Sequence, residues 1–395
     1  MKMKQSIVLI LIVVLVGVVN LNISFTQATL ESQNTIENLS LMPRNHNVMA
    51  YDEESDRIVL FGGYEPSERI VYTETWSYDV NNNVWISMTP DSSPKGGVAP
   101  AMIYDSKIDK MILFGGLTEV NGQPVEYGET WSYDLNTNTW KNLHPSYSPE
   151  PRIAHRMVYD SELDLIILQG GHRPSTGTIF NDIWTYNYSA NNWEQKSVTN
   201  KPSKLDYGLF VYSSVLDKTV YFGQTGETWS YNANNNNYTQ LHPTASPSGR
   251  GGSAVTYNTN TNKIILFGGS SNDFNSGLKD QWNYEYNTNN WTSINGSNAP
   301  SERFFSSMTF DSESNRAILF GGGNSLADVP FNDTWSFNPV TNEWSQLTPT
   351  ITYTNQTNTS NSVISSKSVN SSPSFLWYGL MVLVLFRLVS KKKPT

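Results

Sequence analysis

The sequence predicts an all-β protein, a six-bladed propeller with four antiparallel strands in each blade, followed by one C-terminal transmembrane helix. Three observations lead to this prediction. A short apolar run that ends in a glycine pair recurs along residues 44–350. Each run is followed by two aromatic residues at a fixed spacing. A separate apolar run close to the C-terminus precedes three lysines.

The composition agrees with a β-rich fold. Of the 395 residues, 15% are charged and 12% are aromatic, including 12 Trp and 21 Tyr. Aromatic side chains fit pleated, half-buried surfaces, and the abundant Asn and Gly supply turns. The net charge of −9 argues against a nucleic-acid partner, because phosphates select basic surfaces. The absence of cysteine excludes disulfides, thiolate metal sites and cysteine nucleophiles.

Residues 1–28 are predicted to form a secretory signal peptide. Lys2 and Lys4 precede an uninterrupted apolar run over residues 7–19, and the small residues around Ala28 suit a cleavage site. An uncleaved N-terminal anchor is the alternative interpretation. In both cases the domain that follows is expected to be exported.

The repeat unit has a period of about 50 residues, the length of one propeller blade. Its apolar run reads IVLFGG, MILFGG, IILQGG, TVYFGQ, IILFGG and AILFGG in the successive copies. The first aromatic of each copy is Trp76, Trp131, Trp184, Trp229, Trp282 and Trp335. The second aromatic is Trp85, Trp140, Trp193, Tyr238, Trp291 and Trp344.

Each copy contains four short β patterns that are separated by Asn- and Asp-rich turns, which predicts an antiparallel meander. Repeated four-stranded meanders of this length predict a propeller, in which each blade covers the apolar faces of its neighbours. The predicted blades cover residues 44–94, 95–151, 152–203, 204–249, 250–302 and 303–350.

The glycine pair, the aromatic at the end of the first strand and the two spaced tryptophans resemble kelch repeats across residues 44–350. This resemblance implies a radial ring of six blades. The glycines are expected to let the second strand end close beside a neighbouring blade. The fourth copy departs from the pattern at Gln224 and Tyr238, so a thinner blade is expected there. The N-terminal segment 29–43 is a candidate closing strand that pairs with the last blade.

Residues 351–374 are rich in Ser, Thr and Asn and are predicted to form an extended stalk, with possible N-glycosylation sequons such as Asn355. Residues 375–389 are apolar apart from Arg387, and residues 375–390 are predicted to span the membrane, leaving 391–395 as a basic cytoplasmic tail. A buried core helix is the alternative interpretation of this run. The arrangement resembles the C-terminal anchors of archaeal and bacterial surface proteins. It predicts a single-pass membrane protein with its propeller on the extracellular side.

The candidate binding surface is the face that carries the loops between the second and third strands, because these loops are long and variable whereas the opposite turns are short. The less repetitive side chains on these loops are the candidate contacts. They are Tyr64, Arg69, Tyr127, Arg173, Phe274 and Phe331.

Two charged positions repeat near the same face. Arginine occupies one position in four copies, at Arg44, Arg152, Arg250 and Arg303. An acid stands two residues before every first tryptophan, at Glu74, Glu129, Asp182, Glu227, Asp280 and Asp333. One interpretation is that these groups pair with each other and stabilise the fold. The other is a partly open basic ring around the channel mouth that binds a carboxylate or sulfate of a partner.

No catalytic or metal-binding constellation is identified. The five histidines lack metal-binding spacing, and the Asp-rich turns are repeated hairpin turns. Copper radical oxidases of the kelch family require a cysteine, which this chain lacks. The leading hypothesis is a non-enzymatic, cofactor-free surface module that binds an extracellular protein or glycan. The alternative is an extracellular carbohydrate-active isomerase or hydrolase with an arginine/carboxylate site at the channel mouth.

Overall fold

The computed structural model describes residues 41–353, apart from residues 204, 272–273 and 327–328. The expected signal peptide, most of segment 29–43, the transmembrane helix at 375–390 and the basic tail lie outside the described residues. In the described part, no helix is long and apolar enough to cross a bilayer. The chain divides into a first unit that ends at Met42 and a second unit that begins at Pro43. The described residues of the first unit, Leu41 and Met42, have no regular secondary structure.

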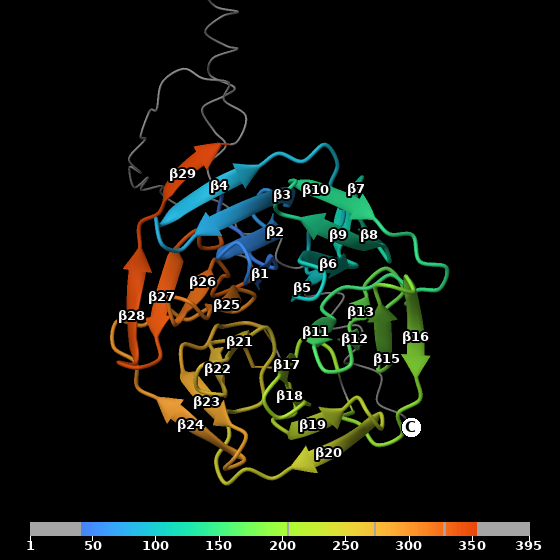
Figure 1. Cartoon of the computed structure of the whole chain (residues 1–395). Coiled ribbons are helices and arrows are strands. Elements are labelled where there is room, and N and C mark those ends of the chain that lie inside the picture. The colour runs from blue at the N-terminus through green and yellow to red at the C-terminus, as the bar shows by residue number, and fades with distance from the viewer. Residues whose placement is uncertain (1–40, 204, 272–273, 327–328, 354–395) are drawn as a thin grey trace, which may run out of the picture. The chain divides into compact units, whose positions relative to one another are not determined.

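The described residues of the second unit form six four-stranded blades, which confirms the predicted all-β propeller (Figure 1). Blade 1 contains β1 (Val48–Asp52), β2 (Arg57–Glu65), β3 (Ile70–Asp79) and β4 (Val84–Met88). Blade 2 contains β5 (Ala101–Asp105), β6 (Lys110–Phe114), β9 (Thr130–Asp134) and β10 (Thr139–Asn142). Blade 3 contains β11 (Arg156–Asp160), β12 (Leu165–Gln169), β15 (Ile183–Asn187) and β16 (Asn192–Lys196).

Blade 4 contains β17 (Leu209–Ser213), β18 (Lys218–Phe222), β19 (Thr228–Asn232) and β20 (Asn237–Leu241). Blade 5 contains β21 (Ala254–Asn258), β22 (Lys263–Phe267), β23 (Gln281–Glu285) and β24 (Asn290–Ile294). Blade 6 contains β25 (Ser307–Asp311), β26 (Arg316–Phe320), β27 (Thr334–Asn338) and β28 (Glu343–Leu347). Every strand of blade 4 has five residues, so this blade is not thinner than its neighbours, contrary to the expectation from its sequence.

The first strand of each blade is the innermost one. β1, β5, β11, β17, β21 and β25 contact one another around a common axis, and each pairs with only one strand of its own sheet (Figure 1). The long-loop face therefore carries the connections from the second to the third strand. The opposite turn face carries the hairpin turns between strands one and two and between strands three and four.

Each of these hairpin turns ends at an Asn or Asp with a positive φ, for example Asp56 (52°) and Asn83 (55°). Asn and Asp tolerate this left-handed conformation better than other side chains do. Most of these residues also accept a hydrogen bond from a tyrosine five positions earlier, as Asn83 does from Tyr78 at 2.7 Å. The repeated Asn and Tyr of the sequence thus cooperate to close the turns.

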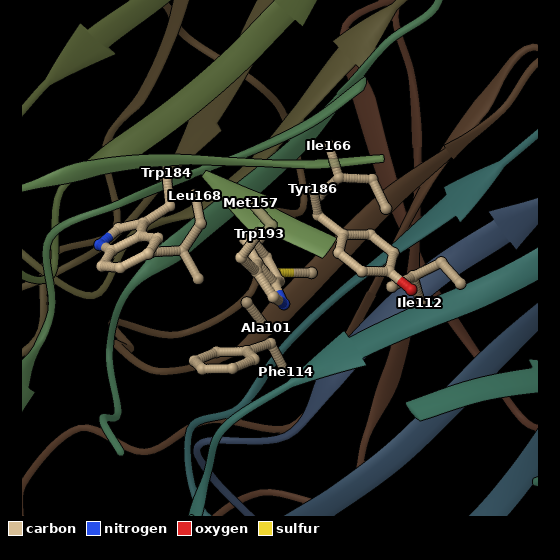
Figure 2. Packing of buried hydrophobic residues seen from close by; sticks show 9 residues of the cluster. All are labelled: Ala101, Ile112, Phe114, Met157, Ile166, Leu168, Trp184, Tyr186 and Trp193. Atoms are coloured by element: carbon tan, nitrogen blue, oxygen red, sulfur yellow. The ribbon is translucent and has the colours of Figure 1, made fainter. Parts of the chain in front are cut away.

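The core lies between the blades, because each sheet packs its faces against its neighbours. Figure 2 shows the boundary of blades 2 and 3, where Phe114 of blade 2 meets Trp193 of blade 3 with ring centroids 5.2 Å apart. Trp193 is fully buried, as is Leu168 in the same cluster. Burial of aromatic surface of this kind is the main stabilising contribution to such a ring.

The second tryptophans also connect neighbouring blades by hydrogen bonds. The indole N–H of Trp140 in blade 2 donates to Thr75 Oγ1 in blade 1 at 2.8 Å. Trp85 in blade 1 donates to Thr334 in blade 6 at 3.1 Å, so the series also joins the first blade to the last. The corresponding acceptors of Trp193, Trp291 and Trp344 are Thr130, Thr228 and Gln281.

A second series of bonds surrounds the central axis. The residue two positions before each first strand has a positive φ, and its N–H donates to the equivalent carbonyl of the preceding blade. His46 completes the series by donating to the carbonyl of Phe305 at 3.0 Å. The six residues are His46, Ala99, Ala154, Tyr207, Gly252 and Phe305.

The C-terminal strand β29 (Thr350–Tyr353) adds a parallel fifth strand to the outer edge of blade 1, beside β4. Residues 351–353, which the sequence placed at the start of the stalk, therefore belong to a sheet. Their apolar Ile351 and the available edge of β4 explain the difference, because an unpaired edge is a template for another strand. The candidate pairing of segment 29–43 with the last blade falls mostly on residues outside the described part.

Candidate functional site

The four repeated arginines are buried, with exposed fractions of 0% for Arg44, 1% for Arg152, 2% for Arg250 and 1% for Arg303. Each guanidinium binds the acid thirty residues later in its own blade. The ion pairs are Arg44–Glu74 at 3.0 Å, Arg152–Asp182 at 2.6 Å, Arg250–Asp280 at 2.5 Å and Arg303–Asp333 at 2.7 Å. A partly open basic ring is therefore wrong as an interpretation, because a desolvated guanidinium requires a fixed partner.

Each of these arginines also fixes the glycine pair of its blade. Nη1 of Arg44 donates to the carbonyl of Gly62 at 3.1 Å, and a Cβ at Gly63 would lie 2.8 Å from Arg44 Cδ. Gly62 approaches the backbone of the next blade equally closely, since a Cβ there would lie 2.3 Å from the carbonyl oxygen of Gly97. The close passage expected of the glycines is confirmed at these positions.

The repeated acids share one further partner. In every blade the acid accepts a hydrogen bond from the indole N–H of the first tryptophan, as Glu129 does from Trp131 at 2.9 Å and Asp333 from Trp335 at 2.6 Å. Blades 2 and 4 carry Gly97 and Leu205 at the arginine position and keep the tryptophan bond. This shared indole donor explains why the acid is repeated in six blades while the arginine occurs in four.

The channel mouth on the long-loop face is filled by apolar side chains. Phe274 is 4% exposed and stacks on Phe305 at 5.2 Å between ring centroids, with Tyr207 at the same distance. Val98 and Ile153 belong to the same cluster. Phe274 therefore packs inside the protein and is unavailable to a partner, which corrects its assignment as a contact residue. The arginine/carboxylate site that the enzyme hypothesis requires at this mouth is absent from the described residues.

Phe331 also has a structural contact, because its ring lies 4.3 Å from the guanidinium carbon of Arg303 and covers it. Tyr127 is half-buried, and its backbone binds Gly116 and Arg152. Burial, together with the negative charge of Glu129, raises the pKa of Tyr127. These two aromatics lie on the expected face, where they line the bases of the loops.

Three long loops form β-hairpins that project from neighbouring blades, and together they are named here the hairpin surface. They are the β2–β3 hairpin of blade 1, the hairpin of β7 (Leu117–Val120) and β8 (Gln123–Glu126) in blade 2, and that of β13 (His172–Arg173) and β14 (Thr178–Ile179) in blade 3. The tight turn of the central hairpin consists of Asn121 and Gly122, with φ of 52° and 73°. This residue pair favours a two-residue hairpin turn.

The central hairpin binds both of its neighbours through two acids. Glu119 accepts two hydrogen bonds from Arg69 of blade 1, at 3.1 Å and 2.7 Å, and a longer one from Tyr64 at 3.5 Å. The hydrogen bonds and charge of Glu119 raise the pKa of Arg69. Glu126 accepts hydrogen bonds from the backbone N–H and the hydroxyl of Ser175 in blade 3, both at 2.7 Å.

Arg173 extends the same network, since it lies 3.7 Å from carboxylate oxygens of both Glu126 and Glu150. The structure thus brings together Tyr64, Arg69 and Arg173 on one surface. Glu119, Glu126 and Ser175, which join them, were not identified from the sequence. The Asn-Gly pair at 121–122 was the signal that could have revealed the central hairpin.

Aliphatic side chains stand at the ends of these hairpins. Ile70 is 38% exposed, Val120 49%, Val125 36% and Ile179 46%. They are called here the hairpin tips. Elsewhere on the same face, a polar groove of about 590 Å³ lies between the loops of blades 5 and 6 and is lined by groups that include Lys279, Glu302 and Asn324.

Among the residues that the structure describes, no three His, Asp or Glu side chains gather closely enough to hold a metal ion.

A ring of six four-stranded blades with glycine pairs, two aromatics per repeat and buried arginine–acid pairs defines a kelch-type propeller. The model of the KLHDC2/KLHL20/DRC7 Kelch-repeats domain matches residues 22–223 and 217–370. The chain therefore belongs to this kelch-repeat family.

Two individual proteins are similar to parts of the chain. Mei4-dependent protein 6 of Schizosaccharomyces pombe is 24% identical over 164 residues, which are 39% of this chain and 23% of that protein. The chain thus spans about a quarter of the length of this curated relative. The solved structure of YjhT superposes with a TM-score of 0.58 at 14% identity, covering 78% of this chain and 99% of that one. At this identity the likeness concerns the fold.

Proposed function

We propose that this protein is a non-enzymatic interaction module that stands on the outer face of a membrane and binds an extracellular partner protein through the hairpin surface. Membership of a kelch-repeat family supports an interaction role. The outer location rests on the sequence at the two ends, namely the expected signal peptide at 1–28 and the expected transmembrane helix at 375–390.

One observation carries the choice of surface. Four aliphatic side chains project into water from three hairpins that are already fixed to one another by Glu119 and Glu126. A surface with a fixed arrangement loses little conformational freedom on binding, which favours affinity. Apolar centres with a rim of charged groups are typical of protein interfaces, and Arg69, Arg173 and Glu150 supply such a rim here.

The four hairpin tips are aliphatic, and this favours a protein partner whose own apolar side chains they can cover. A glycan is the second candidate. It is supported by the polar groove between blades 5 and 6, where Ser276, Lys279, Glu302 and Asn324 present hydroxyl, ammonium, carboxylate and amide groups suited to sugar hydroxyls.

The test compares charged substitutions on the two faces of the full chain. Ile70→Asp, Val125→Asp and Ile179→Asp alter the hairpin tips. Val215→Asp and Val340→Asp are matched controls on the turn face, where the side chains are 63% and 73% exposed. Proteins captured from the extracellular fraction by each variant are identified and quantified by cross-linking mass spectrometry, and each variant is melted to verify its folding.

We expect all five variants to melt like the wild type, because the changed side chains are exposed. The three tip variants should lose the captured partner and the two controls should retain it. Loss of the partner in the two control variants alone would indicate that the interface lies on the turn face. A glycan array with the same variants and with Lys279→Ala tests the second candidate, which requires binding that depends on Lys279 and not on the tips.

A further inference from the structure

The central channel contains a cavity of about 500 Å³ that is lined by the first strands of all six blades. Its inner end reaches the hydrogen-bonded ring that includes His46, Tyr207 and Phe305, and its outer end reaches the turn face at residues such as Glu53 and Ser161. The cavity is therefore separate from the hairpin surface, which lies on the opposite face. Its volume is within the range of small-molecule sites.

One residue of the channel wall breaks the repeat. The first residue of the innermost strand is Val48 in blade 1, Ala101 in blade 2, Leu209 in blade 4, Ala254 in blade 5 and Ser307 in blade 6. In blade 3 the same position is occupied by Arg156, which lines the cavity. A single cation thus stands at a position that is otherwise small, apolar or neutral.

Arg156 also differs from the buried arginines of the repeat in its partners. Among the described residues it forms no ion pair, and its one hydrogen bond runs from Nε to the carbonyl of Gly208 at 2.6 Å. Its Nη1 and Nη2 groups thus have no hydrogen-bond acceptor in the described part of the chain. By contrast, Arg152 binds both carboxylate oxygens of Asp182, at 2.6 Å and 2.9 Å.

The carboxylate that belongs to the cavity wall is too distant to neutralise Arg156. Glu53 lies at the turn-face end, five residues further along the strand direction, which corresponds to roughly 16 Å at the rise of a β-strand. Removing a guanidinium partly from water without a counter-charge costs free energy. A bound anion that pairs with the guanidinium offsets this cost.

We propose that the central channel binds a small organic monocarboxylate, whose two oxygens pair with the Nη1 and Nη2 groups of Arg156. A planar carboxylate matches the fork of a guanidinium, and such charge-assisted pairs are among the strongest hydrogen bonds in proteins. Val48 and Ile103, which are half-buried and also line the cavity, suit an apolar ligand body. The inner edges of the first strands, which no other strand covers, offer further backbone donors and acceptors.

The electrostatic surroundings favour a single negative charge over a multiply charged anion. The protein has a net charge of −9, and Glu53 stands at the channel entrance. Both repel an approaching sulfate or phosphate dianion more strongly than a monocarboxylate.

The experiment titrates sodium benzoate into the full chain by isothermal calorimetry, with benzamide as a neutral isostere and sodium sulfate as a dianion. Arg156→Leu removes the charge and installs the residue that blade 4 carries at this position. Arg156→Lys retains the charge without the fork. Arg316→Leu is the matched control, because Arg316 lies on β26 outside the cavity wall.

We expect benzoate to bind the wild type and Arg316→Leu equally. Binding should be about 10- to 100-fold weaker in Arg156→Leu, the scale of a lost charge-assisted pair, and intermediate in Arg156→Lys. Benzamide and sulfate should bind at least tenfold more weakly than benzoate. Arg156→Leu should also melt no lower than the wild type, because it removes an unpaired charge.

Three results would overturn the proposal. The first is equal benzoate affinity in wild type and Arg156→Leu. The second is the absence of benzoate binding to the wild type up to about 10 mM, because a weaker affinity does not define a site. The third is benzamide binding as tightly as benzoate. Sulfate could also bind in an Arg156-dependent manner while benzoate does not bind. That result would indicate a site for an inorganic anion and would also reject the proposed ligand class.

Discussion

The hydroxyl of Tyr238 in blade 4 donates a hydrogen bond to the side-chain oxygen of Gln169 in blade 3 at 2.5 Å. At the other blade boundaries a tryptophan donates to a Thr or Gln that precedes the first tryptophan of the neighbouring blade. Blade 3 has the apolar Ile183 at this acceptor position, and Gln169 pairs directly with Ile183 on the adjacent strand. Two departures from the repeat, Gln in the third copy and Tyr in the fourth, therefore compensate each other.

This relationship predicts strong coupling between the two residues. Tyr238→Phe should lower the free energy of unfolding by about 1–3 kcal/mol, because it leaves the buried Gln169 amide without its partner. Adding Gln169→Leu should recover part of that loss, since both polar groups are then removed. Urea unfolding of the two single variants and the double variant measures the coupling energy. Tyr147→Phe, at a 55% exposed side chain, serves as the control, and strictly additive effects would contradict the predicted compensation.

The buried arginine pairs predict a graded loss of stability. Arg303→Ala should lower the free energy of unfolding by about 3 kcal/mol, because it leaves Asp333, whose side chain is 17% exposed, without its counter-charge. Arg250→Ala should cost less, about 1–2 kcal/mol, since Asp280 is 39% exposed and water can solvate it. Chemical denaturation of both variants checks the order. Losses below about 0.5 kcal/mol in both would reject the structural role of the arginines.

Two half-buried histidines predict acid sensitivity. Burial, with contributions from His172 and Arg156, lowers the pKa of His46 to about 3, and burial lowers that of His172 to about 4. As the pH falls below about 6.5, the two histidines bind protons in the unfolded chain but stay neutral in the folded protein. The free energy of unfolding therefore decreases. Each histidine should reduce the free energy of unfolding by about 2 kcal/mol between pH 7 and pH 5.

Urea unfolding at the two pH values tests this expectation. His46→Asn keeps a residue that tolerates the positive φ of 55° at this position. The variant should reduce the difference in the free energy of unfolding between pH 7 and pH 5 by about 2 kcal/mol, whatever its effect on stability at pH 7. An unchanged difference would show that His46 is protonated in the folded protein.

The tryptophans of a repeat should differ in their contribution to stability. Trp140 is 3% exposed and bonded to Thr75, so Trp140→Ala should cost about 3–5 kcal/mol. Trp131→Ala should cost less, because Trp131 is only half-buried. Denaturant unfolding compares them, and a larger loss at Trp131 would contradict the packing described at this boundary.

The last strand should contribute little to ring closure. Ile351→Pro removes one β29 hydrogen-bond donor and disfavours its pairing with β4, yet the first and last blades remain joined by His46–Phe305 and Trp85–Thr334. We expect a loss of about 1 kcal/mol or less and faster hydrogen exchange confined to β29 and β4. Global unfolding at a much lower denaturant concentration would instead show that β29 is required to close the ring.

The sequence determined the number of blades and the strand pattern, because both depend on local periodicity and on repeated turn residues that each copy carries for itself. The same reasoning located the hairpin face and three of its residues, Tyr64, Arg69 and Arg173. Phe274 was misassigned because its position in a variable loop indicates exposure, while its burial depends on Tyr207 and Phe305 from other blades.

Only the tertiary structure decided which polar groups have partners. Arg152 and Arg156 are four residues apart and look alike in the sequence, but Arg152 pairs with Asp182, whereas Arg156 lines the channel and forms no ion pair with a described residue. Likewise, the bonds of Glu119 and Glu126 and the pairing of β29 with β4 join segments that belong to different repeats. Hydrophobic periodicity determines the strands within each individual blade. The contacts between blades depend on how the ring brings distant residues together, and no local pattern records them.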